Sequence, residues 1–148
     1  MNIMVEKFVI NNLNDTKNLA ESIADQCSIG NVITLNGTLG AGKTYFTSCF
    51  INYLLKKNGL ETTKVVSPTF NIVKEYKIDD FSVYHFDLYR LKNKNELYEL
   101  DIENAFENGI SIIEWPEIAE DVIYNVVFNI NIEITGENTR IFNVEKVD

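Results

Sequence analysis

Cysteine, proline, glycine and arginine are all scarce in this chain of 148 residues, which holds 2 Cys, 2 Pro and 7 Gly. Cys27 and Cys49 are too few and too far apart to indicate a disulfide framework or a metal knuckle, so we expect reduced thiols. The composition excludes a collagen-like or low-complexity chain. No run reaches the roughly 20 apolar residues of a membrane span, and the N-terminal segment lacks the pattern of a signal peptide. We therefore expect a cytoplasmic protein without membrane contact.

Positive charge is also in short supply. Lys and Arg number 13 against 22 Asp and Glu, which gives a net charge of −9 and a pI near 4.6. Phosphate backbones repel such a chain, so direct binding of nucleic acid is disfavoured. The hydrophobic content of 45% is enough for a core, and the length predicts one domain over residues 1–148.

Strand patterns alternate with helix patterns along the chain. We expect the first helix to be capped by Asn14 or Asp15 and the second to end at Asn58-Gly59. Interleaved strands and helices with two antiparallel hairpins predict a three-layer α/β domain with a mixed, mainly parallel central sheet. The predicted strands cover residues 5–10, 31–36, 63–66, 70–77, 81–87, 110–114, 125–134 and 140–146, and the predicted helices cover 15–28, 43–57 and 94–107.

A phosphate-binding pattern lies between a predicted strand and a predicted helix. Residues 37–44 read Gly-Thr-Leu-Gly-Ala-Gly-Lys-Thr, which matches G-x-x-x-x-G-K-[ST] without a mismatch. The glycines let the loop curl so that its N–H groups face an anion, and the helix adds its positive N-terminal end. Lys43 would reach the β- and γ-phosphates of ATP, and the Thr44 hydroxyl would ligate Mg²⁺. The expected phosphate-binding residues are Leu39, Gly40, Ala41, Gly42, Lys43 and Thr44.

Two acidic residues are candidates for a second metal contact, which P-loop enzymes need at the end of a nearby strand. Asp87 follows FSVYHF and Glu114 follows ISII, so each closes an apolar segment. Both are therefore expected at the carboxyl edge of the sheet, where ligands bind in such folds. We assign catalytic roles to Lys43, Asp87 and Glu114, and metal contacts to Thr44, Asp87 and Glu114. The general base stays open between Glu117 and an unassisted water.

Four motifs occur in a fixed order: residues 37–44, then Ser-Pro-Thr-Phe at 67–70, His-Phe-Asp-Leu-Tyr-Arg at 85–90, and Glu-Trp-Pro-Glu at 114–117. Together they resemble the bacterial TsaE family, also called YjeE, a group of small P-loop ATPases of tRNA threonylcarbamoyladenosine biosynthesis. The resemblance covers residues 9–117 by motif, and the remainder fits in length and strand pattern.

The resemblance implies slow hydrolysis of ATP with Mg²⁺ and work with a TsaB–TsaD-type complex that modifies adenosine 37 of tRNAs reading codons that begin with A. Contact with tRNA would be indirect, through that complex. By this resemblance Thr44 and Glu114 are Mg²⁺ ligands, Asp87 is the Walker B acid, and residues 67–69 form a nucleotide-responsive switch. The adenine pocket would include the segment from Leu13 to Thr16.

The chain departs from the family at Thr38, where an Asp is usual, and at Tyr45, where a Thr is frequent. Neither change removes a phosphate or metal ligand. Thr38 does, however, lack the carboxylate for any role that the usual Asp has in positioning water or a partner. Three side chains have two readings each. His85 is either a strand residue or a site residue, Trp115 either packs beside the nucleotide or stacks on adenine, and Arg90 forms either a surface ion pair or a contact to phosphate or a partner. The acidic run from Glu96 to Glu107 is either a solvated helix face or a docking surface for a basic partner.

Three other functions are alternatives to an ATPase that drives a partner complex. A small P-loop kinase would need a lid domain and an arginine-rich acceptor site, for which the chain has no room. A GTPase would need Asn-Lys-x-Asp, which residues 93–96 approach without matching, and an Asp-x-x-Gly that is absent after Asp87. A nucleotide-gated binding module, in which ATP occupancy sets partner affinity, remains the non-enzyme alternative.

Overall fold

A seven-stranded sheet in the order β1-β7-β6-β2-β5-β4-β3 forms the centre of the protein, in a computed structural model that describes residues 2–147. The strands are β1 (Ile3–Ile10), β2 (Val32–Asn36), β3 (Val73–Lys77), β4 (Ser82–Asp87), β5 (Gly109–Glu114), β6 (Val126–Ile134) and β7 (Arg140–Val147). The helices are α1 (Leu13–Asp25), α2 (Lys43–Lys57), α3 (Asn95–Tyr98) and α4 (Ile102–Asn108), with the 3₁₀ turns η1 (Thr69–Asn71) and η2 (Pro116–Ala119).

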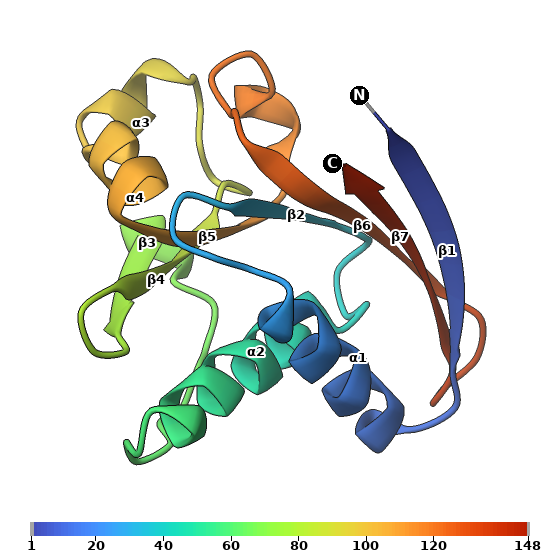
Figure 1. Cartoon of the computed structure of the whole chain (residues 1–148). Coiled ribbons are helices and arrows are strands. Elements are labelled where there is room, and N and C mark those ends of the chain that lie inside the picture. Colours follow the sequence, from blue (N-terminus) through green and yellow to red (C-terminus); the bar gives the residue numbers. More distant parts are fainter. Residues whose placement is uncertain (1, 148) are drawn as a thin grey trace.

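The middle of the sheet is parallel and its flanks are antiparallel. Strands β6, β2, β5 and β4 run in one direction, whereas β7 pairs antiparallel with β1 and β6, and β3 pairs antiparallel with β4. The central strands are continuous apolar runs because both of their faces are covered, and every residue of β5 is buried. Helices α1 and α2 lie on one face, and α3 and α4 lie on the other (Figure 1). The three-layer arrangement with two hairpins is confirmed.

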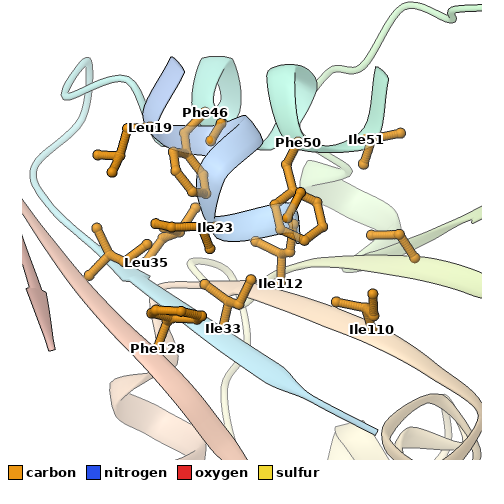
Figure 2. Close-up of a cluster of buried hydrophobic side chains, with 14 of the residues drawn as sticks. Leu19, Ile23, Ile33, Leu35, Phe46, Phe50, Ile51, Ile110, Ile112 and Phe128 are labelled. Carbon is orange, nitrogen blue, oxygen red and sulfur yellow. The ribbon is translucent and has the colours of Figure 1, made fainter. Parts of the chain in front are cut away.

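The larger core lies between the sheet and the pair α1 and α2. Figure 2 shows Phe46 and Phe50 from α2 directed toward Ile33 of β2 and Ile112 of β5, with Ile23 of α1 beside them. A smaller cluster covers the opposite face, where Phe86, Phe106 and Ile113 are buried together. The larger core holds α2, and therefore the loop that precedes it, firmly against the ends of β2 and β5.

Three predictions about local structure are wrong. The first helix begins at Leu13 because the Asn12 side chain accepts from the N–H of Asp15, so Asn12 is the cap instead of Asn14 or Asp15. Residues 63–66 are extended without joining the sheet. The helix expected over 94–107 is two short helices, because Asp101 adopts a left-handed φ of 56° that an α-helix cannot contain. Within residues 2–147, no helix has both the length and the apolar composition that a membrane crossing requires.

The acidic residues of these two short helices do not form one uniform face. Glu99, Asp101, Glu103 and Glu107 are exposed. Glu96 instead accepts from the backbone N–H groups of residues 92 and 93, which lowers its pKa. Four of the five acids are therefore open to solvent or to a partner, and Glu96 caps the turn before α3.

Candidate functional site

The loop of residues 37–42 joins the end of β2 to the start of α2. Gly40 and Gly42 have φ values of 81° and 107°, and the side chain of any other residue would be strained there. Helix α2 begins at Lys43 directly after Gly42, and no side chain caps its first turn. The first N–H groups of a helix have no partner within it, so this end of α2 presents free donors and a positive dipole to the loop.

Lys43 is folded back into the loop that precedes it. Its side chain is buried, and its Nζ donates to the carbonyl oxygen of Gly37 at 2.5 Å and to that of Thr38 at 3.1 Å. The same Nζ lies 4.2 Å from the centre of the Trp115 ring, whose other neighbour is the Tyr89 ring at 4.9 Å. Trp115 therefore packs beside the loop.

Burial lowers the pKa of Lys43, because removing an ammonium from water disfavours its charged form. The nearby carboxylates of Glu114, Asp87 and Glu117 oppose this shift of the pKa. Three carboxylates thus act on one buried ammonium at the loop.

Asp87 and Glu114 are direct neighbours across the parallel ladder of β4 and β5, where each ends its strand. The Thr44 hydroxyl donates to Oε2 of Glu114 at 3.2 Å, which joins the start of α2 to the end of β5. His85 Nε2 lies 2.5 Å from the same oxygen. Glu114 is thus buried and engaged by two polar partners, Thr44 and His85.

Asp87 has its own pair of donors. The Ser67 hydroxyl donates to Oδ2, and the backbone N–H of Tyr89 donates to Oδ1 at 3.0 Å. The segment around Ser67 is thereby fastened to the end of β4. Its neighbours Thr69 and Ile72 adopt left-handed φ values of 42° and 68°, an unfavourable conformation for β-branched residues that this fastening helps to maintain.

Two hollows lie on either side of the loop. The first, of about 450 Å³, is lined by Leu39 to Tyr45 together with Ser67, Thr69, Asp87, Tyr89, Arg90, Glu114 and Trp115. The second, of about 660 Å³, is lined by the residues around the start of α1 and by the turn between β6 and β7. Ala41, Gly42 and Tyr45 line both. A single ligand with an anionic end and a flat apolar end could occupy both hollows.

The structure places the expected phosphate, metal and adenine residues around the two hollows. Leu13 and Thr16, expected near adenine, line the larger hollow, and all the expected phosphate and metal residues line the smaller one. Arg90 also lines the smaller hollow, with its guanidinium 4.4 Å from the centre of the Phe70 ring. Glu117, one of the two options for a base, is not among the lining residues of either hollow.

Sequence reasoning missed one site residue and left another open. His85 was weighed mainly as a strand residue, but it is completely buried against Glu114. Arg140 was not considered, although it donates to the loop carbonyls of Gly40 and Ala41. The available signal was scarcity, because Arg140 is one of only two arginines in the chain.

The oxygen atoms at this edge of the sheet suit a magnesium ion. The Thr44 hydroxyl and the carboxylates of Glu114 and Asp87 are hard donors of the kind Mg²⁺ prefers. In the part of the chain that the structure describes, no cluster of three or more His, Cys, Asp or Glu side chains could hold a metal by itself. That arrangement fits Mg²⁺, which takes one or two carboxylates and completes its shell with water and phosphate oxygens.

The fold and this strand–loop–helix site define a three-layer α/β domain with a mixed seven-stranded sheet and a glycine-rich loop before α2. The chain matches the family model "Threonylcarbamoyl adenosine biosynthesis protein TsaE" over residues 10–142. It therefore belongs to the TsaE family, as its motifs predicted.

Proteins named tRNA threonylcarbamoyladenosine biosynthesis protein TsaE are similar over most of their length. The Rickettsia bellii protein is 35% identical over 97% of both chains, and the Bacillus subtilis protein is 37% identical over 87% of this chain and 78% of its own. A crystal structure of YdiB from Bacillus subtilis superposes with a TM-score of 0.79 and 30% identity, covering 100% of this chain and 89% of that one.

Proposed function

We propose that this protein binds ATP with Mg²⁺ and hydrolyses it slowly, in support of tRNA threonylcarbamoyladenosine formation by a TsaB–TsaD-type complex in the cytoplasm. The observation that carries the proposal is what lines the smaller hollow. The loop of residues 37–44, with its buried Lys43, faces the carboxylates of Asp87 and Glu114, which are neighbours in the register of β4 and β5. Family membership supplies the pathway.

The polar groups at the start of α2 and at the ends of β4 and β5 have distinct roles in this proposal. The free N–H groups at the start of α2 and the Lys43 ammonium bind phosphate oxygens. Thr44, Glu114 and Asp87 would hold Mg²⁺. Bound Mg²⁺ supplies neutralisation of the charge that develops on the phosphate oxygens. The segment from Leu13 to Thr16 forms one wall of the hollow that receives adenine.

Slow intrinsic turnover follows from how the polar groups are engaged. Glu114 already accepts two hydrogen bonds and Asp87 accepts two more, so neither is a free base. Among residues 2–147, Arg90 is the only arginine that lines the smaller hollow, and its guanidinium lies over the Phe70 ring. An arginine supplied by another protein accelerates phosphoryl transfer by roughly 10³–10⁵.

We expect the ATPase rate of a mixture with a purified TsaB–TsaD-type complex to exceed the sum of the separate rates. The measurement is steady-state phosphate release, with the complex also mixed with the Lys43→Ala variant to subtract background. If the rates merely add, and ATP does not alter complex formation measured by sedimentation, the accessory-ATPase proposal is wrong and a small kinase becomes the better hypothesis.

A nucleotide-gated binding module is the second candidate, and one observation favours it. Leu39, Phe70 and Tyr89 are 68%, 77% and 56% exposed, and they lie together beside the smaller hollow. These side chains lie next to the loop and the Ser67 segment. A nucleotide bound in the hollow could therefore change the surface that a partner contacts. ATP-dependent complex formation without any acceleration of hydrolysis would select this alternative.

We expect His85→Leu to reduce Mg²⁺-dependent turnover by about 10- to 100-fold, a typical loss when a group that orients a metal ligand is removed. Leucine fills the buried space but cannot donate to Glu114, whereas His85→Gln keeps a donor and should retain more activity. Titration of the ATPase rate with Mg²⁺ measures the effect, with thermal unfolding as the folding control. Equal Mg²⁺ dependence in the wild type and in His85→Leu would show that His85 has no positioning role.

A further inference from the structure

Arg140, the first residue of β7, joins two segments that are about a hundred positions apart in sequence. Its Nε donates to the carbonyl oxygen of Ala41 at 3.1 Å, and its Nη2 donates to that of Gly40 at 3.3 Å. Its Nη1 donates to the carbonyl oxygens of Gly136 and Thr139, at 2.9 and 2.8 Å, in the turn between β6 and β7. One guanidinium thus links the turn to the loop.

These contacts fix the direction of two peptide groups in the loop. The carbonyl and the following N–H of a trans peptide point in opposite directions, and no peptide bond among residues 2–147 is cis. Holding the Ala41 carbonyl toward Arg140 therefore turns the N–H of Gly42 away from the guanidinium. The preceding peptide is held as well, because the N–H of Ala41 donates to the Thr38 carbonyl while the Gly40 carbonyl faces Arg140.

The bonds within the loop hold the carbonyls of Gly37 and Thr38, whereas those of Gly40 and Ala41 are held by Arg140 from outside it. Gly40 and Gly42 have no side chains to pack, and a Cβ at either would meet nothing within 4 Å. Glycine loses more conformational freedom on ordering than any other residue. Arg140 itself is anchored, because β7 pairs with β1 at Ile10 and with β6 at Ile134 on either side of it. Figure 1 shows the β6–β7 turn at the same edge of the molecule as the start of α1.

We infer that Arg140 is a positioning residue that holds the loop of residues 37–44 in the shape that binds an anion. The planar fork of the guanidinium is required for this role, because a lysine ammonium cannot reach the loop and the turn in fixed directions at once. The inference rests on the proposed function for the nature of the anion, which is the phosphate chain of ATP. The shape of the loop itself can be tested without nucleotide.

The first test is hydrogen exchange in the nucleotide-free protein. We expect Arg140→Lys and Arg140→Gln to speed exchange of the backbone amides of residues 38–43, with little change in the core strands β2 and β5. Lys146→Gln is the matched control, because it removes one positive charge from the same strand at a site that contacts Gln26. Unchanged exchange in the loop of both Arg140 variants, or equal acceleration throughout the protein, overturns the inference.

The second test is calorimetric titration with ATP. We expect the Kd to rise about 10-fold or more in Arg140→Lys, which retains the charge, because misdirected donors lose charge-assisted contacts to phosphate. Millimolar guanidinium should restore part of the affinity to Arg140→Ala, and equal ammonium should not. An unchanged Kd in Arg140→Lys refutes the inference. If the wild type binds no ATP, the proposed function fails, and the exchange test still decides the role of Arg140.

Discussion

Replacing Lys43 by alanine should weaken ATP binding by about 10- to 150-fold and abolish turnover. A charge-assisted contact between an ammonium and a partly desolvated phosphate contributes roughly 1.5–3 kcal/mol, which corresponds to that range of affinity. The side chain is buried in the loop, within reach of the oxygens that a phosphate would place there. Isothermal titration calorimetry measures the affinity, and phosphate release measures the turnover.

The matched control is Lys56→Ala. Lys56 lies on the same helix as Lys43, but it is exposed in the last turn of α2, far from the loop. Removing its charge should leave the affinity for ATP unchanged. Because Lys43 also bonds two loop carbonyls, a thermal melt of Lys43→Ala is needed to show that the domain remains folded. Wild-type affinity in a folded Lys43→Ala protein would contradict the phosphate-binding assignment of the whole loop.

Glu114→Gln and Asp87→Asn should each reduce Mg²⁺-dependent hydrolysis by at least about 100-fold. The metal contributes several kcal/mol of charge stabilisation in the transition state, and each 1.36 kcal/mol is a factor of ten in rate. Both substitutions keep the size of the side chain while removing the charge that attracts Mg²⁺. Steady-state rates over a range of Mg²⁺ concentrations test the expectation.

Glu103→Gln serves as the control for these two variants, because Glu103 is an exposed carboxylate on α4 that lines neither hollow. It should show wild-type kinetics. Affinity for ATP measured without Mg²⁺ should fall little in Glu114→Gln and Asp87→Asn, since neither residue is assigned to the phosphates. Wild-type turnover in both variants would mean that the metal lies elsewhere.

The elements whose ends carry strong local signals were predictable from sequence. Helix α2 runs from Lys43 to Lys57 as expected, because Gly42 precedes it and Asn58-Gly59 stops it. The break at Asp101 was not predictable, because the local sequence favours a continuous helix and tertiary packing overrides it. Residues 63–66 have the composition of a strand, but they follow the end of α2 as extended chain without a ladder partner.

Some residues of the candidate site were predictable from sequence and others were not. The phosphate loop and the two strand-end carboxylates were predictable because each belongs to a local pattern of a few residues. The contacts of Arg140 with Gly40 and Ala41 join residues about a hundred positions apart, and no local pattern encodes such a pairing. His85 alternates with the aromatic residues of its strand, so only the geometry of β4 and β5 reveals its contact with Glu114.

The register of β4 and β5 links assembly of the site to folding. Asp87 and Glu114 stand side by side only when these two strands pair as they do in the native sheet. A slip of one residue would turn one carboxylate to the opposite face of the sheet and separate the pair. A ligand that needs both acids, as Mg²⁺ is expected to, would therefore bind only correctly paired chains, and at a hundred times its Kd it would stabilise them by about 2.7 kcal/mol. Such a ligand would thus favour the native pairing of β4 with β5 over a slipped one.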